Sequence, residues 1–515
     1  MSSRTSSRGG VRQEAASARL RGLQSAMSEV WSQNMGKAGL LLLAFIVAAS
    51  IYAAVTVPPD FVNLWTFNVK AWEDNPYVVP PRWVEALGSS VAPHVARVLD
   101  EPNSASAGVV EVLGQRVVGY VERYTLTYDL REPAFPKDVL LRYLDVKPGT
   151  VAGRGSEVEP QVATYIVLTR PDGREVQLNK PTSRSLSELA QVGVERLDQA
   201  AVAEQLASMF NISLTEAQGK AMLLLFGTPS GEAVEPLTGR YRIDVYLVYT
   251  ARGVNPKELE KAVEGGRLGV GKVKVVVKGS AYGLMGTDDK GRDLYIGLLY
   301  GFPAALLVGL FAAVAFVAIG LITGVVSGYY GGVVDEVIQR TVDILANIPL
   351  LPILIIVGVI VQEMNISPWD RLFIIIGFLI LFSWGGLAII VRSMTLTIKS
   401  EPYIEAAKAI GASNARIIFR HIIPQILPYA MASLVFNVPA AILTEAGLSI
   451  LGIRHGLPTW GSILADARAY IGAGGSYGVW WWILPPGLLI GLTSVAFVFL
   501  GLAIETIVDP RLRRT

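Results

Sequence analysis

The chain has 515 residues, of which 51% are hydrophobic and only 17% are charged, and its net charge is +2. Soluble domains carry about 25% charged residues, so this composition excludes a simple soluble protein, and the near-neutral charge argues against nucleic acid as a partner. The charges are unevenly distributed: residues 58–285 hold 25 Lys and Arg and 27 Asp and Glu, whereas the other 287 positions hold 36 charged residues. One part of the chain therefore has the composition of a soluble domain, and the rest is apolar.

Cysteine is absent, and the three histidines, His94, His421 and His455, lie far apart in the sequence. Disulfides, thiolate metal sites and cysteine nucleophiles are therefore excluded, and a histidine-built metal centre is not expected. No set of residues with the spacing of a catalytic site stands out. We expect no catalytic residue, no metal site and no enzymatic activity in this chain.

Six apolar segments are long enough to cross a bilayer, which takes about 20 residues. The first is 38–57, and the others lie at about 301–326, 344–361, 372–391, 426–444 and 480–504. The sequence therefore predicts an all-α polytopic membrane core with six transmembrane helices, helices 2–6 falling within 286–515. In the N-terminal tail, 1–37, residues 16–31 have the pattern of an interfacial amphipathic helix, with a partly ordered tail as the alternative.

The distribution of Lys and Arg predicts the orientation, because both are enriched in cytoplasmic loops. With the N-terminus inside, the inner segments hold 15 of these residues and the short outer loops hold three. Both termini are therefore expected in the cytoplasm of a multi-pass cell-membrane protein, and residues 58–285 are expected outside.

The interiors of the predicted spans contain no ionisable side chain, whereas ion-coupled carriers usually need such groups. Energy for any transport is therefore expected from outside the spans. The second span instead carries glycine at every fourth position, at Gly320, Gly324, Gly328 and Gly332. Such a face lets helix backbones approach closely, so we expect helix packing within the chain or against a partner; a substrate groove is the alternative.

The charged insert, 58–285, has the pattern of an α+β domain between helices 1 and 2. Its predicted strands are 109–113, 116–130, 163–169, 174–178, 240–250 and 272–279, and its predicted helices are 186–210, 214–226 and 256–264. Its sequence contains no motif that indicates a function.

The loop 392–428 between the fourth and fifth spans contains two predicted short helices. Residues 401–410 form the first, Gly411 suits its left-handed C-cap, and Ser413 can cap a second that runs to Ile423. Small residues in the first helix leave room for a close partner. From the residues alone, this hairpin is either a docking element or a purely structural one.

Specific motifs in this half of the chain resemble those of ATP-binding-cassette importer permeases. Glu405-Ala406-Ala407, followed by Gly411 and by H-I-I-P at 421–424, resembles the EAA loop of that family, although I-x-L-P is the usual ending. The segments 286–301, 328–349, 445–453, 459–468 and 509–514 resemble the dipeptide/oligopeptide/nickel branch, the DppC/OppC-like type.

The resemblance implies the type I importer permease fold and a permease subunit that forms half of a translocation pathway for peptides or a similar small solute, oligosaccharides included. It implies coupling to ATPases through Glu405, Ala406, Ala407, Gly411 and Arg416. The implied partners are a second, DppB-like permease subunit in a heterodimer, two cytoplasmic ATPase subunits, an extracytoplasmic substrate-binding protein and the lipid bilayer. ATP and Mg would be bound by the ATPase subunits, and this chain would bind no cofactor.

A different class of protein remains as the alternative. In a membrane-anchored receptor or adhesion protein, the external domain at 58–285 would be the functional part. Copurification with two ATPases would favour the permease, and ligand binding by a lone chain would favour the receptor.

Overall fold

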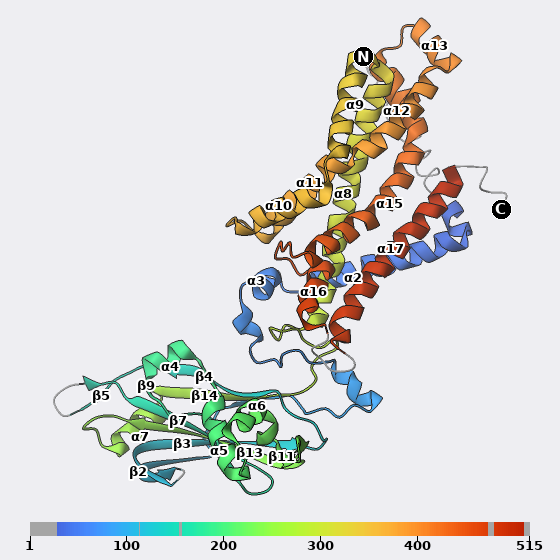
Figure 1. Cartoon of the computed structure of the whole chain (residues 1–515). Helices are drawn as coiled ribbons and strands as arrows, with labels where there is room; N and C mark the ends of the chain where they lie inside the picture. The colour runs from blue at the N-terminus through green and yellow to red at the C-terminus, as the bar shows by residue number, and fades with distance from the viewer. Residues whose placement is uncertain (1–27, 113, 154–156, 472–477, 509–515) are drawn as a thin grey trace, which may run out of the picture. The chain divides into compact units, whose positions relative to one another are not determined.

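The computed structural model describes residues 28–112, 114–153, 157–471 and 478–508 (Figure 1). The chain forms two compact units. The helical unit consists of Met1–Asn68 and Ile296–Thr515, and the α+β unit consists of Val69–Tyr295. The α+β unit thus begins at Val69, later than the expected residue 58. The predicted interfacial helix at 16–31 lies outside the described residues except for its last four, which are helical.

Among the described residues, five helical segments of the helical unit are long and apolar enough to cross a membrane. They are α2 (Asn34–Thr56), α8 (Leu294–Tyr330), α11 with α12 (Pro368–Ser383 and Gly385–Lys399), the run from α14 through a π-helical turn to α15 (Asn414–Ile417, Ile418–Ile422 and Ile423–Ile450), and α17 (Trp480–Val508). The shorter helices are α3 (Phe61–Thr66), α13 (Pro402–Ala409) and α16 (Trp460–Ala467).

The predicted span at 344–361 is interrupted in the structure. The structure has α9 (Gly332–Asn347) and α10 (Leu350–Glu363) instead, and they meet at a bend of 76°. Pro349 explains the break, because proline lacks an amide hydrogen and forces the residue before it out of the helical conformation. Ile348 accordingly has extended backbone angles. Six spans result only if this bent pair is counted as one.

The second helix of the loop does not end at Ile423 as expected. It continues from Asn414 to Ile450 as one long run. The π-helical turn at Ile418–Ile422 directly precedes Pro424, and such local widening accommodates the missing amide hydrogen of a proline within a membrane helix. The loop hairpin is therefore directly continuous with a membrane span.

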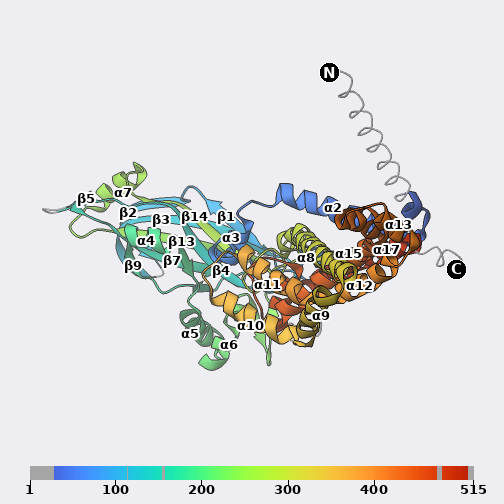
Figure 2. The same ribbon diagram turned by 90° about the horizontal axis from the view of Figure 1, so that it is seen from above.

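Helix α17 packs against both α2 and α15, and all three belong to the helical unit (Figures 1 and 2). Glycines allow both contacts. A side-chain carbon at Gly39 of α2 would lie 2.9 Å from the backbone nitrogen of Leu500, and one at Gly501 of α17 would lie 2.7 Å from the ring of Phe436. These three helices therefore approach one another at glycine positions, as small residues allow in membrane bundles.

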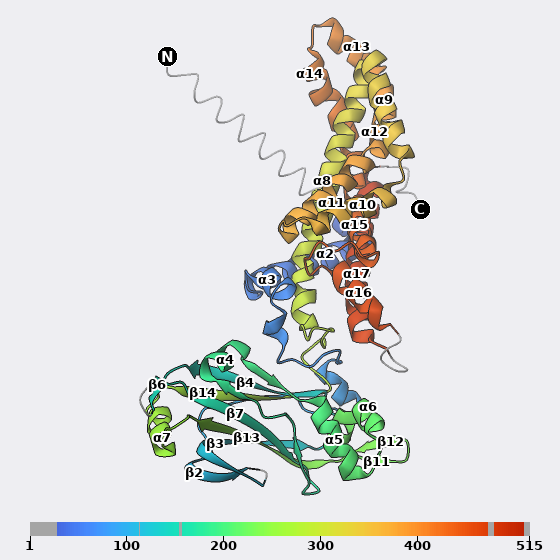
Figure 3. The same cartoon turned by 60° about the vertical axis from the view of Figure 1, so that its left-hand side comes forward.

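The α+β unit contains two main antiparallel sheets (Figure 3). The larger has the order β2-β3-β13-β7-β8, with β9 also pairing with β7, and the four-stranded sheet has the order β1-β14-β4-β10. Alternate residues of the long central strands face one apolar core, among them Tyr124 and Leu126 of β3 and Val245 and Leu247 of β13.

The bounds of the elements in this unit are as follows. The strands are β1 (Val95–Leu99), β2 (Ser104–Val112), β3 (Gln115–Leu130), β4 (Asp138–Lys147), β5 (Val151–Ala152), β6 (Glu157–Val158), β7 (Gln161–Thr169), β8 (Glu175–Gln177), β9 (Ser183–Ser185), β10 (Val194–Arg196), β11 (Gly227–Ser230), β12 (Ala233–Pro236), β13 (Gly239–Thr250) and β14 (Gly269–Lys278). The helices are α4 (Leu186–Val192), α5 (Gln199–Phe210), α6 (Leu214–Leu225) and α7 (Pro256–Glu264).

The six predicted strands and the helices at 214–226 and 256–264 are confirmed within a few residues. The single helix predicted at 186–210 is wrong. Gly193 has a φ of +65° and ends α4, and the next three residues form β10 on the edge of β4 before Asp198 caps α5. Strands β1 and β4 were not predicted.

The segments that enter and leave the α+β unit lie side by side. The amide of Val78 donates to the carbonyl oxygen of Asp288 at 2.9 Å, and the amide of Thr287 donates to the carbonyl oxygen of Val79 at 3.0 Å. The first and last segments of the α+β unit are therefore hydrogen-bonded to each other.

Candidate coupling loop and helix-packing site

The loop between α12 and α15 forms a hairpin by local rules. Helix α13 ends at Ala409, and Gly411 follows with a φ of +84°, a conformation that glycine adopts without steric cost. The amides of Gly411 and Ala412 donate back to the carbonyl oxygens of Lys408 and Ala407 at 2.9 and 3.0 Å. The hydroxyl of Ser413 then accepts from the amide of Arg416 at 3.4 Å and caps α14.

One face of this hairpin is anchored to the helix bundle. Its buried residues join side chains of α8, α12 and α15 in one apolar cluster that includes Val325, Tyr329, Ile398, Ile404, Ile417, Ile418, Ile422 and Ile426. The hydroxyl of Tyr329 at the end of α8 donates to Oδ1 of Asn414 at 2.9 Å. The ammonium groups of Lys399 and Lys408 lie 5.7 and 6.0 Å from the centre of the same tyrosine ring, within the range of cation–π attraction. The hairpin is thereby in contact with three membrane helices.

The other face of the hairpin is open. Glu405, Ala406, Gly411 and Arg416 are exposed, and the side chain of Ile410 is 87% exposed. Ala407 differs from its neighbours, because it is buried against the bundle. The open face thus combines a carboxylate, a guanidinium and an uncovered isoleucine, and it can offer a partner both apolar area and charge pairing.

Of the four glycines spaced four residues apart, the first three lie directly against α12. A side-chain carbon at Gly320 would lie 2.9 Å from Cβ of Leu387, one at Gly324 would lie 2.6 Å from the carbonyl oxygen of Ala388, and one at Gly328 would lie 2.7 Å from the carbonyl oxygen of Arg392. Gly332 has no part in this packing. It starts α9 with a φ of +55°, and a side-chain carbon there would meet nothing within 4 Å.

An ion pair that the sequence did not suggest joins α9 to α12. The guanidinium of Arg392 donates to both carboxylate oxygens of Asp335. The hydroxyl of Ser327, near the end of α8, also bonds to Asp335, and the amide of Gln339 donates to Ser327 at 3.2 Å. Bidentate pairs of this kind fix geometry as well as charge, so polar contacts hold α8, α9 and α12 together.

A second network surrounds Glu445, which the sequence placed only near a span end. Its Oε1 atom accepts from Nε2 of His455 at 2.8 Å, from the hydroxyl of Thr459 at 2.8 Å and from the hydroxyl of Ser449 at 3.0 Å. Nδ1 of His455 accepts from the amide of Leu457 at 3.1 Å, which assigns the proton to Nε2. Because Thr459 also caps α16, this buried network fixes α16 to α15.

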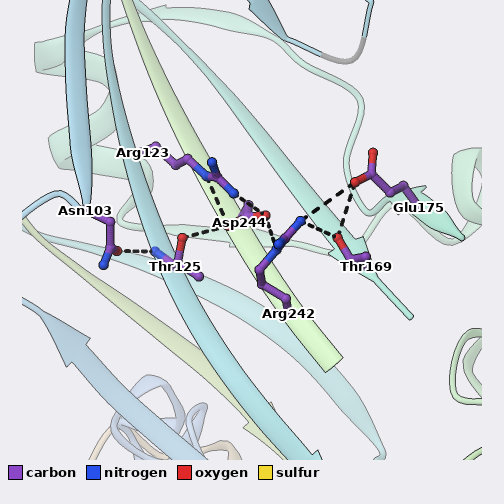
Figure 4. A network of polar contacts seen from close by, with 7 residues as sticks. All are labelled: Asn103, Arg123, Thr125, Thr169, Glu175, Arg242 and Asp244. Atoms are coloured by element: carbon purple, nitrogen blue, oxygen red, sulfur yellow. Dashed lines mark hydrogen bonds and ion pairs between the residues drawn. The ribbon is translucent and has the colours of Figure 1, made fainter. Parts of the chain in front are cut away.

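The α+β unit contains a third polar network, on the strands of its larger sheet (Figure 4). The buried carboxylate of Asp244 accepts from Arg123 at 3.1 and 3.2 Å, from Arg242 at 2.9 Å and from the hydroxyl of Thr125 at 2.7 Å. These bonds satisfy the carboxylate from within the chain, so the network stabilises the sheet and leaves this group without capacity for a ligand. Among the described residues, no group of three or more His, Asp and Glu could hold a metal ion.

A bundle of apolar helices that contains an anchored amphipathic hairpin defines a multi-pass membrane protein. Residues 317–514 match the family described as binding-protein-dependent transport system inner membrane component. The chain is 36% identical over 231 residues to the dipeptide transport system permease protein DppC of Bacillus subtilis (strain 168), a match that covers 44% of this chain and 69% of that protein. It is 33% identical over 231 residues to the oligopeptide permease OppC of the same organism, covering 44% and 72%.

The chain belongs to the ATP-binding-cassette importer permeases of the dipeptide and oligopeptide type, as the sequence motifs predicted. The receptor alternative is not favoured by this membership. A crystal structure of an amino acid ABC transporter with histidines covers 43% of this chain and 95% of its own, with 19% identity and a TM-score of 0.27, which is too low to show a common fold.

Proposed function

We propose that this chain is one permease subunit of an ATP-driven importer and that it forms half of a translocation pathway for peptides or chemically similar small solutes. The observation that best supports this proposal is the α13–α14 hairpin, which is exposed on one face and packed against the membrane helices on the other. In a permease of this family, such a hairpin can receive the motion of an ATPase and pass it to the bundle.

The contacts of the hairpin support a lever mechanism. Displacement of α13 would be passed to α8 and α12 through the shared apolar cluster, and α14 is continuous with the membrane span α15. The glycine contacts and the pair Asp335–Arg392 would make α8, α9 and α12 move together. Glu405 and Arg416 on the open face would pair with charged groups of the ATPase, and Ala406 would allow its close approach.

The remaining partners follow from the same proposal. A second, DppB-like permease subunit would complete the pathway, two cytoplasmic ATPase subunits would bind ATP and Mg, and an extracytoplasmic binding protein would deliver substrate. The excess of Lys and Arg in the inner segments supports cytoplasmic termini and an outward α+β unit, which would then dock the binding protein or cap the pathway.

Replacing Gly411 tests whether the hairpin transmits the motion of the ATPase. Gly411→Val places a β-branched residue at a φ of +84°, which such residues avoid, so the hairpin turn should be lost. We expect substrate-stimulated ATP hydrolysis and uptake by the assembled transporter in proteoliposomes to fall at least tenfold, while the chain still inserts and assembles.

Gly411→Asn is the matched control, because asparagine tolerates the left-handed conformation. It should retain most of the uptake. Full coupling in the valine variant, measured in an assembled and folded complex, would show that the hairpin is not the lever.

A further inference from the structure

A cavity of about 150 Å³ lies among four elements of the helical unit. Its walls come from α8, α10, α11 and α15 and are mostly apolar, with four alanines among them, Ala312 and Ala313 of α8 and Ala440 and Ala441 of α15. A space of this size holds several water molecules, and its wall of alanines leaves room for main-chain atoms of a ligand.

Three polar side chains line the same cavity. Ser383 comes from the last turn of α11, and Asn437 and Thr444 lie seven residues apart on one face of α15. Polar side chains inside a membrane bundle usually hydrogen-bond between helices or line a functional path. Their convergence on one cavity is therefore informative.

The hydrogen bonds of these side chains leave acceptor and donor capacity. The amide nitrogen of Asn437 donates to the carbonyl oxygen of Ser433 at 2.7 Å, and the hydroxyl of Thr444 donates to the carbonyl oxygen of Ala440 at 2.7 Å. No bond of the Asn437 Oδ1 atom or of the Ser383 hydroxyl is seen within the described part of the chain. A ligand that can both donate and accept hydrogen bonds can therefore find partners here.

The cavity has no ionisable residue among its described lining residues. It therefore provides no counter-ion for a charged terminus or side chain, and burial of an unpaired charge would be costly. Neutral amide groups fit better, because each carries one N–H donor and one C=O acceptor, and the apolar walls accept different side chains.

We infer that this cavity is a contact point on the translocation pathway, where Ser383, Asn437 and Thr444 hydrogen-bond the neutral main-chain amides of a short peptide in transit. This inference rests on the proposed transport function and specifies one site of it. The recognition is of peptide groups and is independent of the sequence of the peptide.

Cysteine labelling tests water access, because the natural chain contains no cysteine. Single variants Ser383→Cys, Asn437→Cys and Thr444→Cys are assembled with the partner subunits in proteoliposomes and treated with a charged methanethiosulfonate. We expect all three to react and trialanine to slow the reaction at least fivefold. Thr493→Cys, a buried hydroxyl position of α17 outside the cavity lining, is the control and should stay unlabelled.

A kinetic experiment tests the hydrogen bonds. Loss of one bond to the ligand corresponds to roughly threefold to tenfold in affinity, so Asn437→Leu should raise the KM for trialanine uptake by that factor, with Asn437→Gln closer to the unchanged protein. Unlabelled thiols in a protein that transports trialanine would overturn the inference alone. ATP-driven uptake of another solute but not of trialanine would also overturn the inference, whereas absence of all ATP-driven uptake by the unchanged complex would overturn the proposed function.

Discussion

Glu122 is a carboxyl group in the core of the α+β unit. The hydroxyls of Tyr249 and Tyr124 donate to its Oε2 atom at 3.1 and 3.3 Å, and only 6% of the residue is exposed. Burial raises the pKa of Glu122 from an ordinary 4.5 to about 7, although the tyrosine hydroxyls partly oppose this effect. The group is therefore protonated in the folded unit under conditions in which the unfolded chain has lost the proton.

The direction of the pH dependence follows from this difference. Because the folded state keeps the proton up to about pH 7 and the unfolded state releases it near 4.5, the unit loses stability as pH rises from 4.5 through 7. The loss is on the order of 3 kcal/mol. Glu122→Gln cannot ionise, so at pH 8 calorimetry of the full chain should show the α+β unit unfolding about 5–10 °C higher than in the unchanged protein.

At pH 4 the two proteins should unfold at nearly the same temperature. Asp129→Asn, on the same strand with 44% of the aspartate side chain exposed, is the control and should leave the pH profile unchanged. Equal unfolding temperatures of Glu122→Gln and the unchanged protein at both pH 4 and pH 8 would contradict this account of Glu122.

At the scale of elements, the contact between α8 and α12 depends on glycine. The atoms facing Gly324 are the carbonyl oxygen of Ala388 at 2.6 Å and Cβ of Val391 at 2.7 Å from the position of an added carbon. Neither belongs to the flexible end of a side chain, so the helices must separate to admit even one methyl group.

Gly324→Ala is therefore expected to destabilise the helical unit despite the higher helix propensity of alanine. Overpacking of this kind costs about 1–3 kcal/mol, and the thermal transition of the purified protein in detergent should fall by several degrees. Gly377→Ala in α11 is the matched control, because a side-chain carbon there meets nothing within 4 Å, and it should be neutral or stabilising. Equal behaviour of the two variants would refute the packing role.

Local signals in the sequence predicted some elements well and missed others. The α13–α14 hairpin was predictable because Gly411 and Ser413, which determine its turn and cap, lie within the same short segment. The break at Gly193 was missed because β10 exists only through pairing with β4, which is about 50 residues away along the chain. The break before α10 has a local signal in the sequence, because Pro349 itself interrupts a helix.

The networks of the helical unit were not predictable in the same way. Asp335 and Arg392 are 57 residues apart, and only the packing of α9 on α12 shows that they face each other. Similarly, Glu445 near a span end gave no indication that His455 and Thr459 would fold back onto it. Long-range pairing of side chains depends on helix rotation, which single-sequence periodicity does not determine.

At the scale of the whole molecule, the two units can be separated genetically. Val79 and Thr287 are hydrogen-bonded to each other, so a two-glycine linker can replace residues 80–286 as a tight turn. We expect the shortened chain to insert, to remain monodisperse and to keep the thermal transition of the helical unit, while the transition of the α+β unit disappears.

The same shortened chain tests the proposed role of the α+β unit. Capture of the binding protein by the assembled transporter should weaken if the unit is its dock, and unchanged capture would count against that role. Aggregation or degradation of the shortened chain would show that the helical unit does not fold independently.

The position of β14 has a consequence for the order in which the protein is made. This strand is the last of its domain along the chain, yet it lies between β1 and β4 in the four-stranded sheet. Neither β1 nor β4 can form its hydrogen bonds to β14 until residue 278 has left the ribosome. At a synthesis rate of about 5–20 residues per second, this is on the order of 10–40 s after β1 emerges. Since α8 begins at Leu294, the domain can complete this sheet no earlier than during synthesis of the second membrane segment, and until then it is tethered only through α2.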